Sequence, residues 1–234
     1  MIAAIRRLIN RLRFILGAAR KRTRTSHGCT YDVIDAGTKT GYLLIHGGGW
    51  TGGSRNDPHM GGGDACERLA RHYDCTIVNT DYPLATATEN HWPVQLTALS
   101  KLLDHLSERH GVDDWVIIGA SAGAHLGAEL AMHSRDCVDE FIGFYGCYDL
   151  TAGRDFMPEV NRRIEMTFGD KARGASPLYD KWPAGVKTTL IHGDEDQTVS
   201  IRQSERMAEA VGVPLIRVIG ARHAFDVVEW LENH

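Results

Sequence analysis

The chain has 234 residues, of which 43% are hydrophobic and 24% are charged, and its formal net charge is −4 at pH 7. This length suits one α/β domain with a complete core and leaves no room for a second large domain. The cysteines are odd in number, scattered and without the spacing of a metal site, which predicts reduced thiols in a cytoplasmic protein. They are Cys29, Cys66, Cys75, Cys137 and Cys147.

The N-terminal segment, residues 1–25, differs in charge from the rest of the chain. It holds eight of the 26 Lys and Arg residues and none of the 30 Asp and Glu residues. Its apolar residues recur at helical spacing, which predicts a basic amphipathic helix over 2–20, too short in its apolar stretch for an ordinary signal peptide. We expect this helix to dock on the acidic body of its own chain or across a homodimer, and not to bind nucleic acid. Peripheral contact with an anionic membrane surface is the alternative.

From residue 26 onward, strand and helix patterns alternate. The predicted strands lie at 31–35, 42–46, 75–80, 115–119, 139–145, 187–192 and 214–219, and the predicted helices at 64–73, 93–110, 121–134, 200–211 and 223–232. This alternation predicts a single α/β domain over 26–234, with a mostly parallel sheet covered by helices on both faces. The connection at 147–185 contains a further helix pattern at 157–168.

Two motifs each follow a predicted strand directly: His-Gly-Gly-Gly-Trp at 46–50 and Gly-Ala-Ser-Ala-Gly at 119–123. The small residues around Ser121 allow a tight strand-to-helix turn that exposes its hydroxyl. A serine hydroxyl is a poor nucleophile, so it needs a base and hydrogen-bond donors for the developing oxyanion. The pair of motifs therefore predicts a nucleophile at Ser121 beside a glycine-rich loop that stabilises negative charge.

The remaining parts of such a site follow Ser121 in the expected order, an acid and then a histidine. The strand at 187–192 opens into a loop with three competing carboxylates, Asp194, Glu195 and Asp196. The strand at 214–219 is followed by His223. These loops all lie at the carboxyl ends of predicted strands, where open α/β sheets bind their ligands. The residues alone leave the choice among the three carboxylates open.

On these motifs the chain resembles the α/β-hydrolase superfamily over residues 40–230. Within it, the chain is similar to the hormone-sensitive-lipase-like esterases and to the kynurenine-formamidase and feruloyl-esterase-like groups. Further matching segments are Asp-Tyr-Pro-Leu at 81–84, Ala-Ser-Pro-Leu at 175–178 and His-Gly-Asp-Glu-Asp-Gln-Thr-Val at 192–199. The resemblance implies an α/β-hydrolase fold in which 147–185 forms a short lid over a fairly open pocket.

The resemblance also assigns roles to individual residues. It selects Asp196, three residues before the valine of its loop, as the acid of a catalytic triad with Ser121 and His223. It makes His46 and His125 structural residues of the loop and of the nucleophile helix. The oxyanion-hole donors that it implies are the backbone N–H groups of Gly48, Gly49 and Ala122.

Aromatic residues are candidates for the wall of an apolar pocket, although about half of them are expected to be ordinary core residues. The main candidates are Trp50, Tyr82, Tyr145 and Trp182, with Trp92 and Tyr148 beside them. No cofactor or metal site is predicted, because the acidic loop lacks Ca²⁺-loop spacing and neither H-E-x-x-H nor a paired C-x-x-C occurs.

The activity that the resemblance implies is that of a serine carboxylic-ester hydrolase acting on small-molecule esters, either short-chain or small aryl, through an acyl-enzyme intermediate. An arylformamidase would use the same triad on an N-formylkynurenine-type amide. From a different class, a non-catalytic ligand-binding protein on the same fold is the other alternative.

Overall fold

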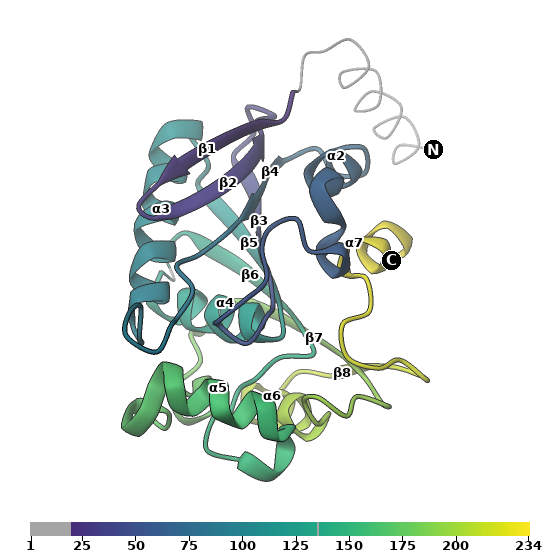
Figure 1. Ribbon diagram of the computed structural model, residues 1–234. Helices are drawn as coiled ribbons and strands as arrows, with labels where there is room; N and C mark the ends of the chain where they lie inside the picture. The colour runs from purple at the N-terminus through teal and green to yellow at the C-terminus, as the bar shows by residue number, and fades with distance from the viewer. Residues whose placement is uncertain (1–19, 135) are drawn as a thin grey trace.

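The computed structural model describes residues 20–134 and 136–234. In this part of the chain, an eight-stranded sheet runs in the order β1-β2-β4-β3-β5-β6-β7-β8 (Figure 1). β2 is antiparallel to both β1 and β4, and the other neighbouring pairs are parallel. The strands are β1 (Arg22–Ser26), β2 (Cys29–Ile34), β3 (Thr40–Ile45), β4 (Thr76–Thr80), β5 (Asp114–Ala120), β6 (Val138–Phe144), β7 (Lys187–Gly193) and β8 (Leu215–Val218).

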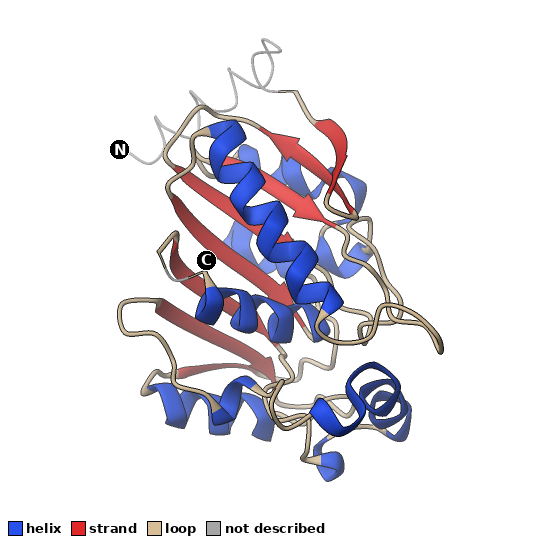
Figure 2. Ribbon diagram, turned by 90° about the vertical axis from the view of Figure 1, so that its left-hand side faces the viewer, coloured by secondary structure: helices blue, strands red, loops and turns tan. Residues whose placement is uncertain are grey.

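Helices cover both faces of the sheet (Figure 2). Alternate side chains of β5 pack in two separate core clusters: Trp115 and Ile117 belong to one, and Val116 and Ile118 belong to the other. A strand that is buried on both faces has to be apolar throughout, which explains this continuous run. The first cluster includes side chains of α3 (Val94–His110), α4 (Ala122–His133), α5 (Pro158–Phe168) and α6 (Arg202–Val211), and the second those of α2 (Ala65–Ala70) and α7 (Val227–Asn233).

The predicted mostly parallel sheet with helices on both faces is confirmed, and two elements differ from the prediction. β1 has no predicted counterpart, because its sequence Arg-Thr-Arg-Thr-Ser forms a largely exposed edge strand without an apolar face. The last helix begins at Val227 instead of 223, because Asp226 caps it by accepting a 2.9 Å hydrogen bond from the Glu229 N–H. His223 therefore lies on the loop before that helix.

Residues 2–19 of the N-terminal helix predicted at 2–20 lie outside the described residues. Its contacts with its own chain, a second copy or a membrane surface therefore remain predictions. Among the described residues, no helix combines the length and the apolar character that crossing a lipid bilayer requires. The helix pattern at 157–168 corresponds to α5.

Parallel pairing brings the ends of distant segments to one edge of the sheet. β3, β5, β7 and β8 run in the same direction, so the loops that follow them lie at the same edge. Those loops carry the glycine-rich motif, Ser121, Asp196 and His223. The topology thus positions the glycine-rich loop and the three predicted triad residues at one edge of the sheet.

Candidate active site

Ser121 occupies a strained turn between β5 and α4. Its φ of 53° and ψ of −117° belong to a region that non-glycine residues rarely adopt. A Cβ atom added at Gly119 would lie 2.3 Å from the Gly123 carbonyl oxygen, and one added at Gly123 would lie 2.1 Å from the Ile45 carbonyl oxygen. Only glycine fits at both positions, which lets the turn press against β3 and present the serine hydroxyl.

His223 links the serine to a carboxylate. Its Nε2 atom lies 3.0 Å from the Ser121 Oγ atom, and its Nδ1 atom lies 2.6 Å from the Asp196 Oδ2 atom. With Nδ1–H donating to the carboxylate, Nε2 is free to accept the serine proton. The Tyr145 ring packs edge-on against the imidazole with centroids 4.8 Å apart, and its hydroxyl donates to the Phe225 carbonyl. Tyr145 therefore contacts the loop that carries His223 at two positions, His223 and Phe225.

The Asp196 carboxylate is fully buried and bonded at both oxygens. Oδ1 accepts from the backbone N–H groups of Thr198 at 2.8 Å and Val199 at 3.0 Å, and Oδ2 faces both His223 and His192. Burial alone would raise the pKa of this carboxyl, but the hydrogen bonds from the two histidines and the backbone outweigh it and hold the pKa well below its ordinary value. Asp196 is thus an anion at neutral pH.

The two other candidate carboxylates point elsewhere. Asp194 accepts a 2.7 Å hydrogen bond from the Gly220 N–H, and the exposed Glu195 lies 3.9 Å from Arg222. Of the three, the structure brings Asp196 to His223. Among residues 20–134 and 136–234, no group of three or more His, Cys, Asp or Glu side chains is arranged to hold a metal ion.

The glycine-rich loop packs directly against the turn that carries Ser121. A Cβ atom at Gly47 would lie 3.2 Å from that of Ser121. Gly48 and Gly49 adopt φ values of 105° and 59°, and a Cβ at Gly48 would lie 2.1 Å from the Gly52 carbonyl oxygen. Ala122 is the first residue of α4, so its N–H lies outside the helical hydrogen-bond ladder. These are the positions of the predicted oxyanion-hole donors.

Two buried histidines anchor this loop. The indole Nε1–H of Trp50 donates to His125 Nδ1 at 3.2 Å, and His125 Nε2–H donates to the Ala175 carbonyl at 2.7 Å. Burial lowers the pKa of His125 to about 4, so this imidazole is neutral and both of its nitrogens are used. His46 lies 2.6 Å through Nδ1 from the Gly47 carbonyl oxygen, and burial lowers its pKa as well.

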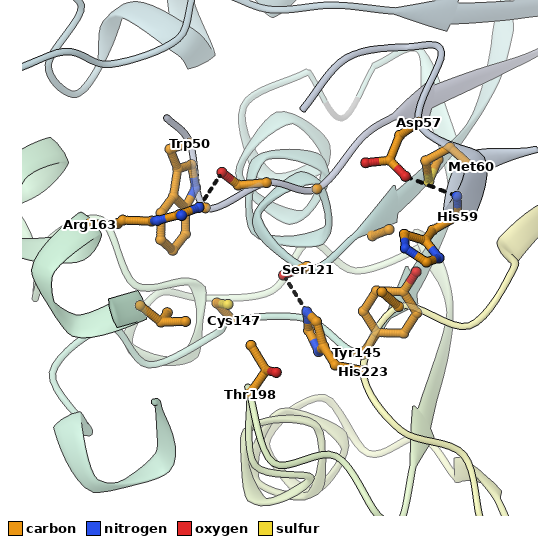
Figure 3. Close-up of a pocket in the computed structure, with 16 residues that line it drawn as sticks. Trp50, Asp57, His59, Met60, Ser121, Tyr145, Cys147, Arg163, Thr198 and His223 are labelled. Carbon is orange, nitrogen blue, oxygen red and sulfur yellow. Dashed lines mark hydrogen bonds between the residues drawn. The ribbon is translucent and has the colours of Figure 1, made fainter. Parts of the chain in front are cut away.

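A cavity of about 240 Å³ opens beside the serine, and the structure corrects half of the predicted wall (Figure 3). Trp50 and Tyr145 line it. Tyr82 does not, because it stacks on the His46 imidazole with centroids 4.3 Å apart. Trp182 does not either, because it packs against the core and donates its Nε1–H to the Thr188 hydroxyl. An aromatic residue alone does not tell a core position from a wall position.

Several lining residues were not singled out by the sequence. Val160 and Arg163, one helical turn apart, come from α5. Asp57 and His59 come from the short turn beside the glycine-rich loop; they and Arg163 are labelled in Figure 3. The spacing of the α5 pair is a signal that the sequence contains, but nothing in it shows which helix face meets the cavity. Cys147 also lines the wall, and burial raises the pKa of its thiol, which weighs against a cysteine nucleophile.

His192 is a further residue that sequence reasoning missed. It is fully buried at the end of β7, and its Nε2 atom lies 3.1 Å from the Asp196 Oδ2 atom. Its only sequence signal is its place at the start of the acidic loop. A polar side chain at the end of a buried strand needs a partner, and here the partner is the carboxylate of that loop.

Comparisons with known proteins identify the fold family. The profile of a family described as alpha/beta hydrolase fold matches residues 42–227. A curated relative, the esterase LipQ of Mycobacterium tuberculosis, is 26% identical over 167 residues, which cover 58% of this chain and 40% of that protein. The chain thus matches less than half the length of this relative.

Similar solved structures share the architecture. EstE7, a hormone-sensitive-lipase homologue from a metagenome library, gives a TM-score of 0.72 at 22% identity, covering 88% of this chain and 78% of that one. Carboxyl esterase 2 of the fungus Tuber melanosporum gives 0.71 at 19% identity, covering 90% and 81%. A truncated carbohydrate esterase from gut microbiota gives 0.71 at 14% identity, covering 92% and 94%. With a profile match over most of its length, the chain belongs to the α/β-hydrolase fold family.

Proposed function

We propose that the protein is a serine carboxylic-ester hydrolase. The observation that carries this proposal is the continuous chain of contacts from Ser121 through His223 to Asp196, at 3.0 and 2.6 Å, next to the glycine-rich loop. The names of its relatives, an esterase and a carboxyl esterase among them, point the same way.

The geometry supports a two-step acyl transfer. The Ser121 Oγ atom attacks the ester carbonyl while His223 Nε2 takes the hydroxyl proton, and Asp196 stabilises the imidazolium that forms. The carbonyl oxygen becomes an oxyanion. The backbone N–H groups of Gly48, Gly49 and Ala122 donate hydrogen bonds to it. His223 then protonates the departing alkoxide, and a water activated by the same imidazole releases the acid from the acyl-enzyme.

The cavity supports small substrates. Its volume of about 240 Å³ is below the range of about 300–1,000 Å³ that is common for sites of drug-sized ligands. Apolar side chains, Trp50, Met60 and Val160, contribute to its wall. We infer a preference for short-chain or small aryl esters over long acyl chains.

The experiment that tests the proposal is labelling with a fluorophosphonate probe, which reacts with an activated serine. The parent protein should be labelled, the Ser121→Ala variant should not, and turnover of p-nitrophenyl butyrate should fall by at least about 10³-fold in the variant. Ser100→Ala is the matched control, since Ser100 lies on α3 and does not line the cavity. Equal labelling of parent and Ser121→Ala would remove the nucleophile assignment, and no labelling of either would favour a non-catalytic protein.

A substrate panel tests the substrate class. Turnover should be fastest with p-nitrophenyl acetate or butyrate and slower with the octanoate, because the longer chain exceeds the cavity. N-Formylkynurenine belongs in the same panel. Faster hydrolysis of this amide than of every ester would assign the protein to the arylformamidases instead.

The cysteines support a cytoplasmic location. Cys29, Cys66, Cys75, Cys137 and Cys147 are all free thiols, and all but Cys137 are buried. Disulfides form and persist in oxidising compartments, whereas free thiols are usual in the cytoplasm. Cell fractionation with an antibody to the chain tests this location, and recovery in the medium or an envelope fraction would contradict it.

A further inference from the structure

Arg163 of α5 lies across the glycine-rich loop. Its Nη1 atom donates a 3.1 Å hydrogen bond to the Gly48 carbonyl oxygen (Figure 3). A Cβ atom added at Gly49 would lie only 2.7 Å from the Arg163 Cδ atom. The arginine stem thus fills the space that the missing side chain of Gly49 leaves open. One residue of α5 therefore contacts both glycines of the proposed oxyanion hole.

The contact with the Gly48 carbonyl has a consequence for the Gly49 N–H. Both groups belong to one planar trans peptide unit, in which the C=O and the N–H point in opposite directions. A donor that holds the carbonyl from one side therefore fixes the direction of the N–H on the other side. Glycines at φ values of 105° and 59° have many alternative conformations, so this peptide unit needs such a hold.

The backbone supplies part of that hold by itself. The Gly52 N–H donates to the Gly48 carbonyl at 3.1 Å, and the Thr51 N–H lies at 3.4 Å from the same oxygen. Arg163 adds the charged donor to this acceptor. A charge-assisted hydrogen bond is stronger than a neutral one, and it polarises the peptide so that its N–H becomes a better donor.

Another residue of α5 positions the Arg163 guanidinium. Glu159, one helical turn earlier, accepts from Arg163 Nε at 3.2 Å, which leaves Nη1 for the loop. Arg162 pairs with the same carboxylate, but its side chain is 70% exposed and it does not line the cavity. The two adjacent arginines therefore share a partner and differ in their contact with the loop.

We propose that Arg163 is a positioning residue of the reaction: it orients and polarises the peptide unit between Gly48 and Gly49 so that the Gly49 N–H meets the oxyanion. The inference rests on the proposed ester hydrolysis. It makes α5 part of the apparatus that stabilises the transition state, in addition to a wall of the cavity. An interaction of this kind acts in the transition state and affects kcat more than KM.

The test compares three variants on p-nitrophenyl butyrate. Arg163→Met, which keeps the stem and removes the donor, should lower kcat by about 10-fold and leave KM within about twofold, a smaller loss than removal of an oxyanion donor itself. Arg163→Lys, which restores a charged donor, should recover most of this loss. Arg162→Met, which loses the same partner without touching the loop, should match the parent. A trifluoromethyl ketone, which forms an oxyanion adduct, should bind Arg163→Met about 10-fold more weakly.

Two results would overturn the inference. Unchanged kcat in Arg163→Met would mean that the backbone turn alone holds the loop. A rise in KM confined to esters with a carboxylate on the acyl chain would mean that Arg163 binds substrate. Fluorophosphonate labelling of the parent separates this failure from that of the proposed function. If the parent is labelled and kcat of Arg163→Met is unchanged, the role of Arg163 is refuted and the proposed hydrolase activity stands. Matching circular dichroism spectra and melting temperatures show that the variants are folded.

Discussion

The Nε2 atom of His192 lies 3.1 Å from the same Asp196 oxygen that His223 contacts at 2.6 Å through Nδ1. His192 also lies 3.0 Å through Nε2 from the Val199 carbonyl oxygen and 2.7 Å through Nδ1 from the Ser204 hydroxyl. With a proton on Nε2, the imidazole makes all three contacts: the Nε2–H is shared between the Asp196 and Val199 oxygens, and Nδ1 accepts the hydrogen bond of the Ser204 hydroxyl. The carboxylate that contacts His223 thus also contacts a second histidine, His192, which is fully buried.

Replacing His192 with phenylalanine should therefore slow the reaction without touching the cavity. We expect kcat to fall about 10-fold, the lower end of the loss on removing an outer-shell partner at a metal site. The Ser204 hydroxyl would lose its acceptor, which costs about 1–3 kcal/mol of stability. Steady-state kinetics and urea unfolding measure the two effects. His133→Phe, at an exposed histidine, is the control, and an unchanged kcat in His192→Phe would show that the backbone N–H groups alone orient Asp196.

The two aspartates of the acidic loop should respond very differently to the same change. Asp196→Asn should lower kcat by about 10³- to 10⁴-fold, because the amide no longer stabilises the imidazolium and favours the wrong tautomer of His223. Asp194→Asn keeps an oxygen to accept from the Gly220 N–H and should stay within about threefold of the parent. Initial rates on one ester suffice for the comparison. The reverse ranking would transfer the role of the acid to Asp194.

Glu129, buried in α4, should make stability fall as the pH rises. Burial, assisted by the charge of Asp180, raises its pKa from 4.5 to about 8. Between these values the unfolded chain releases a proton that the folded chain keeps, so the stabilisation is complete below about pH 4.5 and is lost as the pH rises through 8. The loss between pH 5 and 8 should be on the order of 3–4 kcal/mol.

Urea unfolding at pH 5 and pH 8 measures this loss. Glu129→Gln, which has the shape of the protonated acid but cannot ionise, should reduce the difference in unfolding free energy between the two pH values. Glu108→Gln removes the same formal charge from an exposed position of α3 and should leave the difference unchanged. Equal pH dependence in the parent and in Glu129→Gln would show that another group causes it.

Adding one methyl group to the nucleophile turn should be severely destabilising. In Gly123→Ala the new Cβ would lie 2.1 Å from the Ile45 carbonyl oxygen, and backbone cannot move aside as a side chain does. We expect a loss of about 3 kcal/mol or more. Gly174→Ala, where the added atom would lie 3.7 Å from its nearest neighbour, should stay within about 0.5 kcal/mol. A parent-like melting temperature for Gly123→Ala would contradict the close packing of the turn against β3.

The sequence predicts the sheet well because its signals are local. The apolar residues within 42–46 and 115–119 reflect burial on both faces, and the helices that connect the strands require parallel pairing. The motif at 119–123 predicts the tight turn directly, since the turn leaves space only for glycine at 119 and 123. These features need no knowledge of distant neighbours.

Other features depend on contacts between distant segments and could not be derived in the same way. Tyr82 and Tyr145 look equivalent as sequence, yet one stacks on His46 and the other contacts His223. The place of Arg163 depends on which face of α5 meets the cavity, and this is decided by the path of the whole connection. The residues left the three loop carboxylates undecided because their side-chain directions follow from the turn geometry.

The cavity wall and the reactive groups come from different stretches of polypeptide, and α5 joins them. Val160 and Arg163 face the same cavity, but only Arg163 contacts the Gly48 carbonyl. Substitutions in this helix that are meant to admit bulkier esters would thus change the shape of the cavity at Val160 and the rate of turnover at Arg163. Libraries that vary Val160 while retaining Arg163 would separate the two properties, so that selectivity evolves without a penalty in rate.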